Sequence, residues 1–227
     1  MSKLPVENHL ICYIDVLGFK EKIKTMDENE FLQIIHSAYN IAIRDIGVMS
    51  QPTHSNCQFI HKAFSDNIII CTPSINTSAV YSLFYLAYII QQLFISKELL
   101  IRGSITKGLL FINNDYVFGS GLINAYELEN EIAFYPRIVV DKNIALEEVD
   151  RQYSDKLFCI DGDGYAMIDY LRVRQNDTRF IEKHRVIIEG MLHEHKENSK
   201  VYQKICWCKE YHNKACRQNT VDCMIQI

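Results

Sequence analysis

The hydrophobic pattern of the first fifty residues predicts a buried strand followed by an amphipathic helix. Apolar side chains run almost unbroken through residues 9–14, and the run ends at Asp15, which is typical of a strand buried on both faces. After Asp27, apolar residues recur every three or four positions to about residue 46, the spacing of one helix face. Glu30 lies three residues after Asp27 and completes a capping box.

The next apolar segments predict a hairpin and a buried helix. Residues 57–63 and 67–72 are rich in strand-forming residues and enclose a short turn that carries Asp66. The helix expected over residues 74–96 is strongly apolar, but two glutamines interrupt it and it is short for a membrane span. We therefore interpret this segment as a core helix.

Residues 101–129 combine a strand, a turn at residues 113–115 and a helix whose start is marked by glycine. Four of the chain's nine glycines fall in this segment. Glycine permits positive φ and the close approach of another backbone. The segment therefore predicts a strand and a helix that fit together at close range, and residues 136–140 predict one more strand.

The order of these elements predicts the fold class. A strand, helix, hairpin, helix, strand, helix and strand in succession indicate an α/β (α+β) fold, a ferredoxin-like sandwich with a mixed, mainly antiparallel sheet. We place the boundary of this core at residue 141, so that residues 1–141 form the core and residues 142–227 form a C-terminal extension packed on it.

The extension is expected to add a hairpin and helices to the core. Residues 143–154 predict a helix, and a Gly-Asp-Gly turn at residues 162–164 predicts a hairpin. Residues 180–195 and 200–216 predict two charged amphipathic helices. The last residues are expected to form a frayed tail.

Composition narrows the classes of function. The formal net charge is −4, which argues against a nucleic-acid-binding surface or a polybasic membrane anchor. The polar N-terminal residues show no signal peptide, and eight cysteines without an export signal indicate reduced thiols. We therefore expect a cytoplasmic protein with neither a membrane nor a nucleic acid as partner.

Asp15 and Asp66 are the candidate catalytic residues. Each stands where a strand ends or a hairpin turns, and their strands are expected to be neighbours in the sheet. Two converging carboxylates suit two divalent cations, Mn²⁺ or Mg²⁺, in an in-line displacement at phosphorus. Taken singly, each aspartate is more often a turn former or a cap.

A second cluster of possible ligands lies in the last predicted helix. Cys208, His212 and Cys216 recur every four residues, with Cys206 nearby, and thiolate–imidazole clusters bind zinc. One helix does not readily supply three tetrahedral ligands to one ion, so we favour a packed helix face.

Residues 101–129 also resemble the central signature of class III nucleotidyl cyclases. The matching residues are Arg102, Gly103 and Gly108 on the strand and Gly119, Ala125, Leu128 and Glu129 on the helix. The resemblance implies that Asp15 and Asp66 hold the metals, while Lys62 and Tyr116 read the base and Phe19 adds a substrate contact. It also implies a homodimer whose catalytic clefts form between the two subunits.

The helix departs from that family at two positions. Members usually carry an Asn and an Arg that stabilise the transition state, and Ile123 and Glu127 stand there in this chain. Arg102 is our candidate phosphate cation, with Arg137 and Lys107 as alternatives. We expect Arg102 to face the aspartates of the other subunit across the cleft.

Several short segments are most similar to the bacterial Pycsar pyrimidine cyclases: IDVLGF, FSDN, IRGSITKG, AYELE and WCKEYHN. The resemblance implies conversion of UTP or CTP to the 3′,5′-cyclic monophosphate and diphosphate in antiphage defence, with a separate effector protein activated by the product. We favour UTP because Lys62 can donate to a carbonyl oxygen, and uracil offers two but cytosine one. Tyr116 is expected to shorten the pocket against purines. The alternative is a catalytically silent cyclase-like module that binds a nucleotide or a partner as a sensor.

Overall fold

The structure is a computed structural model that describes residues 5–25, 27–49, 58–73, 75–149, 157–174 and 177–226. Its strands form one sheet in the order β2-β3-β1-β4-β6-β8-β7, and β5 pairs with β4 beside this path. All described pairings are antiparallel except that of β4 with β6. The strands are β1 (Glu7–Val16), β2 (Ile60–Phe64), β3 (Asn67–Thr72), β4 (Ile101–Ile112), β5 (Val117–Phe118), β6 (Ile138–Val140), β7 (Phe158–Ile160) and β8 (Ala166–Ile168).

The first four long strands have the ferredoxin-like arrangement. They lie in the order β2-β3-β1-β4, with α1 (Phe19–Thr25) and α2 (Glu28–Met49) between β1 and β2 and with α3 (Thr77–Ile95) between β3 and β4. The predicted fold class is therefore confirmed: a mixed, mainly antiparallel sheet with added C-terminal helices. The boundary at residue 141 stays a prediction, and the hairpin of β7 and β8 extends the same sheet.

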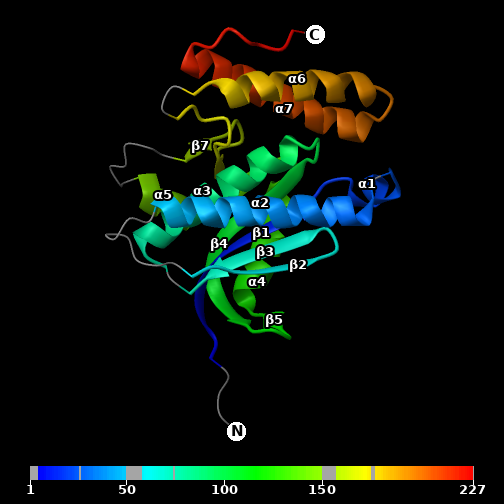
Figure 1. Cartoon of the computed structure of the whole chain (residues 1–227). Coiled ribbons are helices and arrows are strands. Elements are labelled where there is room, and N and C mark those ends of the chain that lie inside the picture. Colours follow the sequence, from blue (N-terminus) through cyan, green and yellow to red (C-terminus); the bar gives the residue numbers. More distant parts are fainter. Residues whose placement is uncertain are drawn as a thin grey trace.

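Alternate residues of β1 face two different hydrophobic clusters. Leu10, Cys12 and Ile14 belong to the large core with α3, whereas Ile11 and Tyr13 belong to a smaller cluster with α4 (Ser120–Ile132). This is the period of two that a strand imposes. Figure 1 shows α2 and α3 in front of the sheet, while α4 and β5 lie behind its lower part.

The helix starts follow the polar residues that precede them. Asp27 Oδ1 accepts hydrogen bonds from the backbone N–H groups of Asn29 and Glu30, at 2.9 and 3.2 Å, at the start of α2. Asn76 Oδ1 accepts one from Ala79 N at 2.9 Å at the start of α3. Ser74, another polar residue before α3, lies outside the described residues.

The prediction of a core helix is confirmed for α3. It is long and apolar enough to cross a membrane by composition alone, but 67% of its apolar window is buried inside the protein. Its two glutamines are used in the interior, where the Gln92 side chain donates to Tyr170 O at 2.8 Å and that of Gln91 to Pro136 O at 3.4 Å. Burial with hydrogen-bonded amides is the structure of a core helix.

The C-terminal helices α6 (Arg179–Glu194) and α7 (Ser199–Asn219) pack side by side at the top of Figure 1. Arg137, before β6, is 1% exposed and its guanidinium pairs with Asp161 and Asp163 in the turn between β7 and β8. Trp207 of α7 donates to the same Asp161 at 3.3 Å and stacks on Tyr135. This cluster attaches α7 to the sheet.

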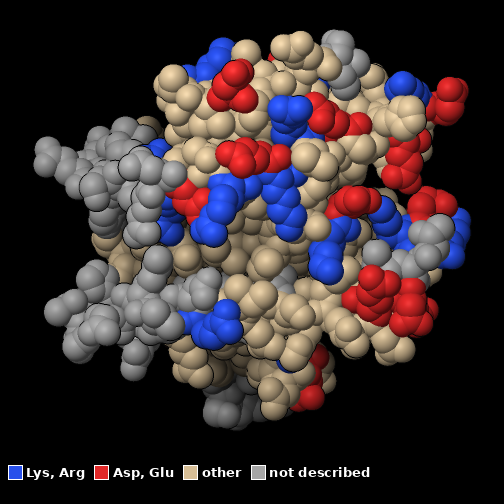
Figure 2. Space-filling view, turned by 45° about the horizontal axis from the view of Figure 1, so that its top comes forward, with Lys and Arg blue, Asp and Glu red and all other residues tan. Residues whose placement is uncertain are grey.

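Charged side chains of both signs are interspersed on the face drawn in Figure 2. Lys and Arg lie beside Asp and Glu there, as expected for a solvated surface.

Some predicted element ends differ from the structure. α2 continues to Met49 instead of residue 46, and β2 begins at Ile60 instead of residue 57. The helix predicted over residues 143–154 corresponds to α5 (Lys142–Val149). Residues 50–57 and 150–156 lie outside the described part of the chain.

The prediction of a frayed tail is wrong for the residues described. The N–H of Ile225 donates to Asn213 Oδ1 at 2.8 Å, and the Asn213 amide donates back to Ile225 O at 3.1 Å. Thr220, with a left-handed φ of 55°, reverses the chain after α7. The side chains of Cys223 and Ile225 are buried in the main core, so the tail returns along α7.

Gly108 on β4 and Gly121 on α4 set the distance between strand and helix. A Cβ atom placed on Gly108 would lie 2.6 Å from the Cα atom of Gly121, well inside contact distance. The predicted close fit of this strand and helix is therefore confirmed, and it rests on two residues without side chains.

We predict that Gly108→Ala destabilises the fold by about 1–3 kcal/mol, because α4 must move away from β4 to admit the methyl group. The matched control is Gly190→Ala on α6, where an added Cβ has no neighbour within 4 Å. That change should increase stability by about 0.5–1 kcal/mol through helix propensity. Urea denaturation of both variants measures the difference, and equal stabilities would contradict the close-contact argument.

Candidate active site

Asp15 and Asp66 meet where β1 ends and β3 begins. We call this end of the strands, with Asp15 and Asp66, the aspartate edge. Asp15 is the ninth residue of β1 and pairs in register with Asn67 at the start of β3. The N–H of Val16 donates to the carbonyl oxygen of Asp66 at 2.9 Å, so the two aspartates lie at the ends of adjacent strands. The expected adjacency of their strands is therefore present in the structure.

The turn between β2 and β3 presents Asp66 to solvent. Ser65 has a left-handed φ of 55°, which permits the tight reversal from Phe64 to Asn67. The Asn67 amide donates to Asp66 Oδ1 at 3.0 Å, and the hydroxyl of Tyr13 donates to Asn67 Oδ1 in turn. A hydroxyl, an amide and a carboxylate thus form a chain of hydrogen bonds that orients Asp66.

Arg102 joins Asp15 to a buried glutamate of the same chain. Its Nε–H donates to Asp15 Oδ2 at 3.0 Å, and the same nitrogen lies 2.6 Å from Glu129 Oε1. The latter oxygen accepts no hydrogen bond in the described structure, so this contact is an ion pair without a directed N–H. The expectation that Arg102 faces the aspartates of another subunit is therefore wrong.

Glu129 is 2% exposed, at the end of α4 that faces the sheet edge. Burial raises the pKa of this carboxyl to about 7, the neighbouring Arg102 lowers it, and Asp15 raises it further. Desolvation therefore outweighs the ion pair. In the sequence Glu129 only matches the family motif, and the contact of Glu129 with Arg102 is seen in the structure.

The phenol of Tyr13 is also affected by the carboxylates at this edge. Burial raises the pKa of its phenol to about 12, and Glu129, Asp15 and Asp66 add to the shift. The phenol therefore remains a neutral donor to Asn67. The ring of Tyr126 on α4 packs edge-on against Tyr13, with 6.1 Å between centroids.

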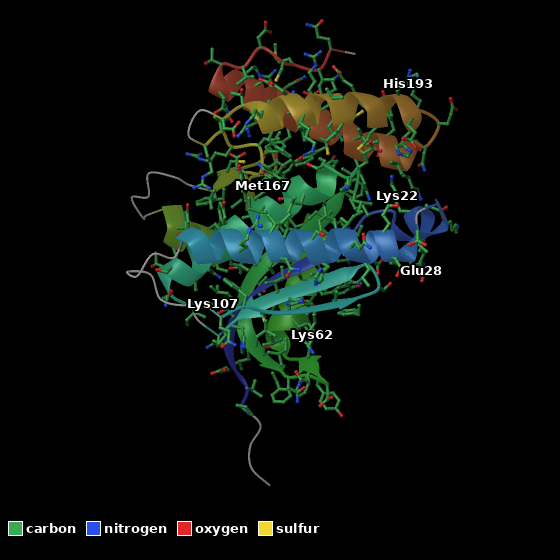
Figure 3. All side chains as sticks on the ribbon, in the orientation of Figure 1. Lys22, Glu28, Lys62, Lys107, Met167 and His193 are labelled. Atoms are coloured by element: carbon green, nitrogen blue, oxygen red, sulfur yellow. The ribbon has the colours of Figure 1, made fainter. Side chains whose placement is uncertain are left out.

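The two alternative cations lie away from this edge or are engaged elsewhere. Arg137 is buried and pairs with Asp161 and Asp163. Lys107 follows Arg102 by five residues on β4, so it lies about 17 Å along the strand, and Figure 3 shows it on the other side of the molecule from α1, which carries Lys22. Arg137 is therefore engaged by two other carboxylates, and Lys107 lies away from Asp15.

Lys204 is a cation that the sequence analysis missed. It lies on α7, and its ammonium is 5.9 Å from the ring centroid of Phe134. Burial and Arg102 lower its pKa, whereas Asp15 and Glu129 raise it, so its charge interacts with the carboxylates of the edge. A lysine in a charged helix carries no sequence signal for this position, because only the packing of α7 brings it there.

Lys62 lies beside the turn that carries Tyr116. The Lys62 ammonium on β2 donates to Asn114 O at 2.8 Å, and Figure 3 shows Lys62 at the lower part of the sheet near β5. Tyr116 is 63% exposed. The structure thus brings both predicted base-reading residues to one region, and their role stays a prediction.

Three predicted positions remain: Phe19, and positions 123 and 127 on α4, where the family usually carries Asn and Arg. Phe19 packs edge-on against Phe31, with 4.9 Å between centroids, at the border of the main core, and its substrate contact stays a prediction. Ile123 is 58% exposed and Glu127 is exposed on the same helix. These positions therefore present an apolar and an acidic side chain to solvent in place of Asn and Arg.

The donor set at the edge fits hard divalent cations. Asp15 uses Oδ2 for Arg102 and Asp66 uses Oδ1 for Asn67, which leaves a second oxygen of each carboxylate for a cation. Carboxylate oxygens are the ligands that Mg²⁺ prefers. The Asp15 side chain is 17% exposed, so an ion can reach it from solvent.

We predict that Glu129 makes the protein less stable as the pH rises from about 4.5 to about 7, because its folded-state pKa lies above its unfolded-state value. The loss should be about 1–3 kcal/mol in the wild type and absent in Glu129→Gln. Glu131→Gln, at an exposed position of α4, is the control. Urea denaturation at several pH values with a chelator present measures the slopes, and equal slopes in wild type and Glu129→Gln would refute the prediction.

Comparison with known proteins gives structural similarity only. No family model and no curated protein matches the chain. The catalytic core of a rhodopsin-guanylyl cyclase with converted specificity, solved in complex with ATPalphaS, is 12% identical with a TM-score of 0.47, covering 72% of this chain and 96% of that one. The adenylate/guanylate cyclase/hydrolase from Silicibacter pomeroyi is 17% identical with a TM-score of 0.43, covering 72% and 95%. Because both scores are below 0.5, the function is inferred from the residues of this chain.

Proposed function

We propose that this protein is a nucleotidyl cyclase that converts a pyrimidine nucleoside triphosphate, UTP before CTP, to the 3′,5′-cyclic monophosphate and diphosphate. The observation that carries the proposal is the meeting of Asp15 and Asp66 at the ends of two hydrogen-bonded strands. Both side chains are reachable from solvent, and Asp15 shares the guanidinium of Arg102 with Glu129. A purely structural aspartate pair has no need of this accumulation of charge.

The reaction is an internal displacement at phosphorus. The ribose 3′-oxygen attacks the α-phosphorus, its proton leaves to solvent or a carboxylate, and diphosphate departs with the electrons of the broken P–O bond. Two Mn²⁺ or Mg²⁺ ions held by Asp15 and Asp66 would lower the pKa of the 3′-hydroxyl and neutralise the phosphate charge. Arg102 would keep Asp15 oriented, and Lys204, whose charge interacts with Asp15 and Glu129, is a further cation at this edge.

Lys62 and Tyr116 are proposed to choose the base. The Lys62 ammonium has three donors, so its bond to Asn114 O leaves others for the carbonyl oxygens of uracil. Cytosine offers one such oxygen instead of two. The phenol of Tyr116, which is exposed, is proposed to limit the depth of the base site and so to disfavour two-ring bases.

A second copy of the chain is the proposed partner. We define the α4 surface as the two exposed apolar residues one turn apart on α4, Ile123 and Tyr126. Neighbouring exposed apolar side chains mark interaction sites. Tyr126 contacts Tyr13 beside the aspartate edge, so a copy bound to the α4 surface would close the site from that side.

The cellular role follows from the family resemblance and belongs to the proposal. A cytoplasmic cyclase of this kind would release cyclic UMP or cyclic CMP as a second messenger in antiphage defence, and a separate effector protein would bind the product. Nothing in this role requires a membrane or a nucleic acid.

The second candidate function is a catalytically silent module that binds a nucleotide without turnover. The observation that favours it is the engagement of Arg102 by Asp15 and Glu129, together with Ile123 and Glu127 at the positions of the usual Asn and Arg. A silent module would bind a triphosphate and leave it intact.

The deciding experiment is an assay of the purified full chain with equal concentrations of ATP, GTP, CTP and UTP and with Mn²⁺ or Mg²⁺. We expect cyclic UMP to be the main product by mass spectrometry. Asp15→Asn and Asp66→Asn should each reduce turnover at least about 100-fold, because each removes a charged metal ligand, while their melting curves remain cooperative. Asp222→Asn, at an exposed position, is the control.

A dominant cyclic purine product would overturn the base assignment. Wild-type turnover by a folded Asp15→Asn or Asp66→Asn variant would overturn the two-metal assignment. Binding of a triphosphate without any product from the wild type would support the silent module instead.

We predict that Ile123→Lys on the α4 surface converts a dimer to monomers and lowers activity, because a buried lysine at the interface loses its hydration. Val186→Lys on α6 is the matched control, since Val186 is 68% and Ile123 58% exposed. Sedimentation velocity and the cyclase assay measure both variants. A fully active wild-type monomer would contradict the proposed dimer.

A further inference from the structure

Three ligand groups converge between α7 and the returning tail. His212 and Cys216 lie one turn apart on α7, and Cys223 approaches them from the tail. Their relative exposures are 0%, 1% and 6%. The sequence analysis considered Cys208 with His212 and Cys216 and favoured a packed helix face, because one helix does not supply three ligands. In the structure the third possible ligand is Cys223, from the tail, and not Cys208.

The distances suit a single ion at the centre of the three groups. Cys216 Sγ lies 3.3 Å and Cys223 Sγ 3.8 Å from His212 Nε2, and the two sulfur atoms are 3.2 Å apart. Tetrahedral zinc, with bonds of about 2.3 Å to sulfur and about 2.1 Å to nitrogen, requires ligand separations of about 3.6–3.8 Å. Shifts of a few tenths of an ångström therefore suffice. The carbonyl oxygen of Cys223 accepts a hydrogen bond from Nε2 at 2.8 Å. A metal on Nε2 would replace that proton and leave the oxygen available as a fourth ligand.

The histidine has the outer partner that metal-bound imidazoles use. His212 Nδ1 lies 3.1 Å from Nδ1 of His184 on α6, and His184 Nε2 lies 3.3 Å from the hydroxyl of Tyr170. With a metal on Nε2, His212 carries its proton on Nδ1 and donates it to His184, which donates onward to Tyr170. Such a partner fixes the tautomer and orientation of a ligating histidine. His184 and Tyr170 are both fully or almost fully buried.

The tail is held so that Cys223 stays at this position. The paired hydrogen bonds between Asn213 and Ile225 fix the chain two residues beyond Cys223, and the left-handed Thr220 fixes the reversal before it. The side chains of Cys216 and Cys223 are both buried, so the centre is closed to solvent. A thiophilic cation supplies the charge that makes thiolates favourable in this environment.

We propose that His212, Cys216 and Cys223 bind one zinc ion that fastens the C-terminal tail to α7. Zinc is the ion of choice because the donors are two thiolates and an imidazole around a small, closed centre. The ion would be structural, since all three ligands are buried. This site is separate from the aspartate edge, so the proposal does not depend on the cyclase function.

The experiment uses the full chain, purified with a reductant and without a polyhistidine tag. We expect about one zinc per chain by elemental analysis and a melting temperature that falls by about 5 °C or more when a strong chelator removes it. Added Zn²⁺ should restore the melting temperature. Cys223→Ser should bind Zn²⁺ at least about tenfold more weakly in a competition titration with a coloured chelator, whereas Cys206→Ser, on the same helix but outside the cluster, should bind it as the wild type does.

Thiol alkylation of the wild type provides a readout that does not require a stable variant. In mild denaturant, Zn²⁺ should slow the labelling of Cys216 and Cys223 but not that of Cys206, as read by peptide mass spectrometry. Three results would overturn the proposal: no zinc taken up by the metal-free wild type, equal labelling with and without Zn²⁺, or a Cys216–Cys223 disulfide in protein kept under cytoplasmic reducing conditions.

Discussion

The guanidinium of Arg102 holds two carboxylates from different elements at one edge of the sheet. Asp15 is the second-last residue of the central strand β1, and Glu129 lies in the last turn of α4, which covers the opposite face of the sheet from α3. Removing one partner of a buried pair leaves an uncompensated charge, typically at a cost of about 3–5 kcal/mol. Arg102 therefore adds an ion pair to the close contact of Gly108 with Gly121 in holding α4 on the sheet.

The same edge retains an excess of negative charge. Asp15 and Glu129 face the cations Arg102 and Lys204, and Asp66 adds a further carboxylate at the end of the neighbouring strand. Burial outweighs the two cations and raises the pKa of Glu129 to about 7. Two events would lower the free energy of these neighbouring negative charges: Glu129 takes a proton, or a divalent cation binds the aspartates. In the proposed two-metal site, the cations would offset this charge at neutral pH, where protonation of Glu129 is only partial.

The residues at strand ends were predictable from the sequence because a strand pattern fixes where its ends lie. The apolar run before Asp15 and the hairpin pattern around Asp66 predicted the positions of both aspartates. The glycines at positions 108 and 121 predicted a close approach of strand and helix. The ion pair of Arg102 with Glu129 was not predictable, since it depends on how far α4 rotates on the sheet. For the same reason the sequence pointed to Arg102 as a phosphate cation, although it is engaged by carboxylates of its own chain.

The tail shows a different limit of sequence reasoning. Residues 221–226 lack the periodicity of a strand or helix, so they resemble a frayed end. Their order comes from one asparagine that satisfies both backbone groups of Ile225 and from a reversal at Thr220. Such contacts are specified by single polar residues and leave no pattern. Cys223 therefore acquired a possible ligand role only when the chain was seen to return.

α7 connects the two charged regions of the protein. Near its middle, Trp207 binds the Arg137–Asp161 cluster beneath β6, and one turn earlier Lys204 interacts with the aspartate edge. Eight residues after Lys204, His212 joins α7 to α6 and to the tail. Because a helix transmits position along its axis with little bending over this length, fixing the C-terminal end of α7 also fixes the place from which Lys204 reaches the carboxylates. The added helices thus contribute to the electrostatics of the sheet edge as well as to the core.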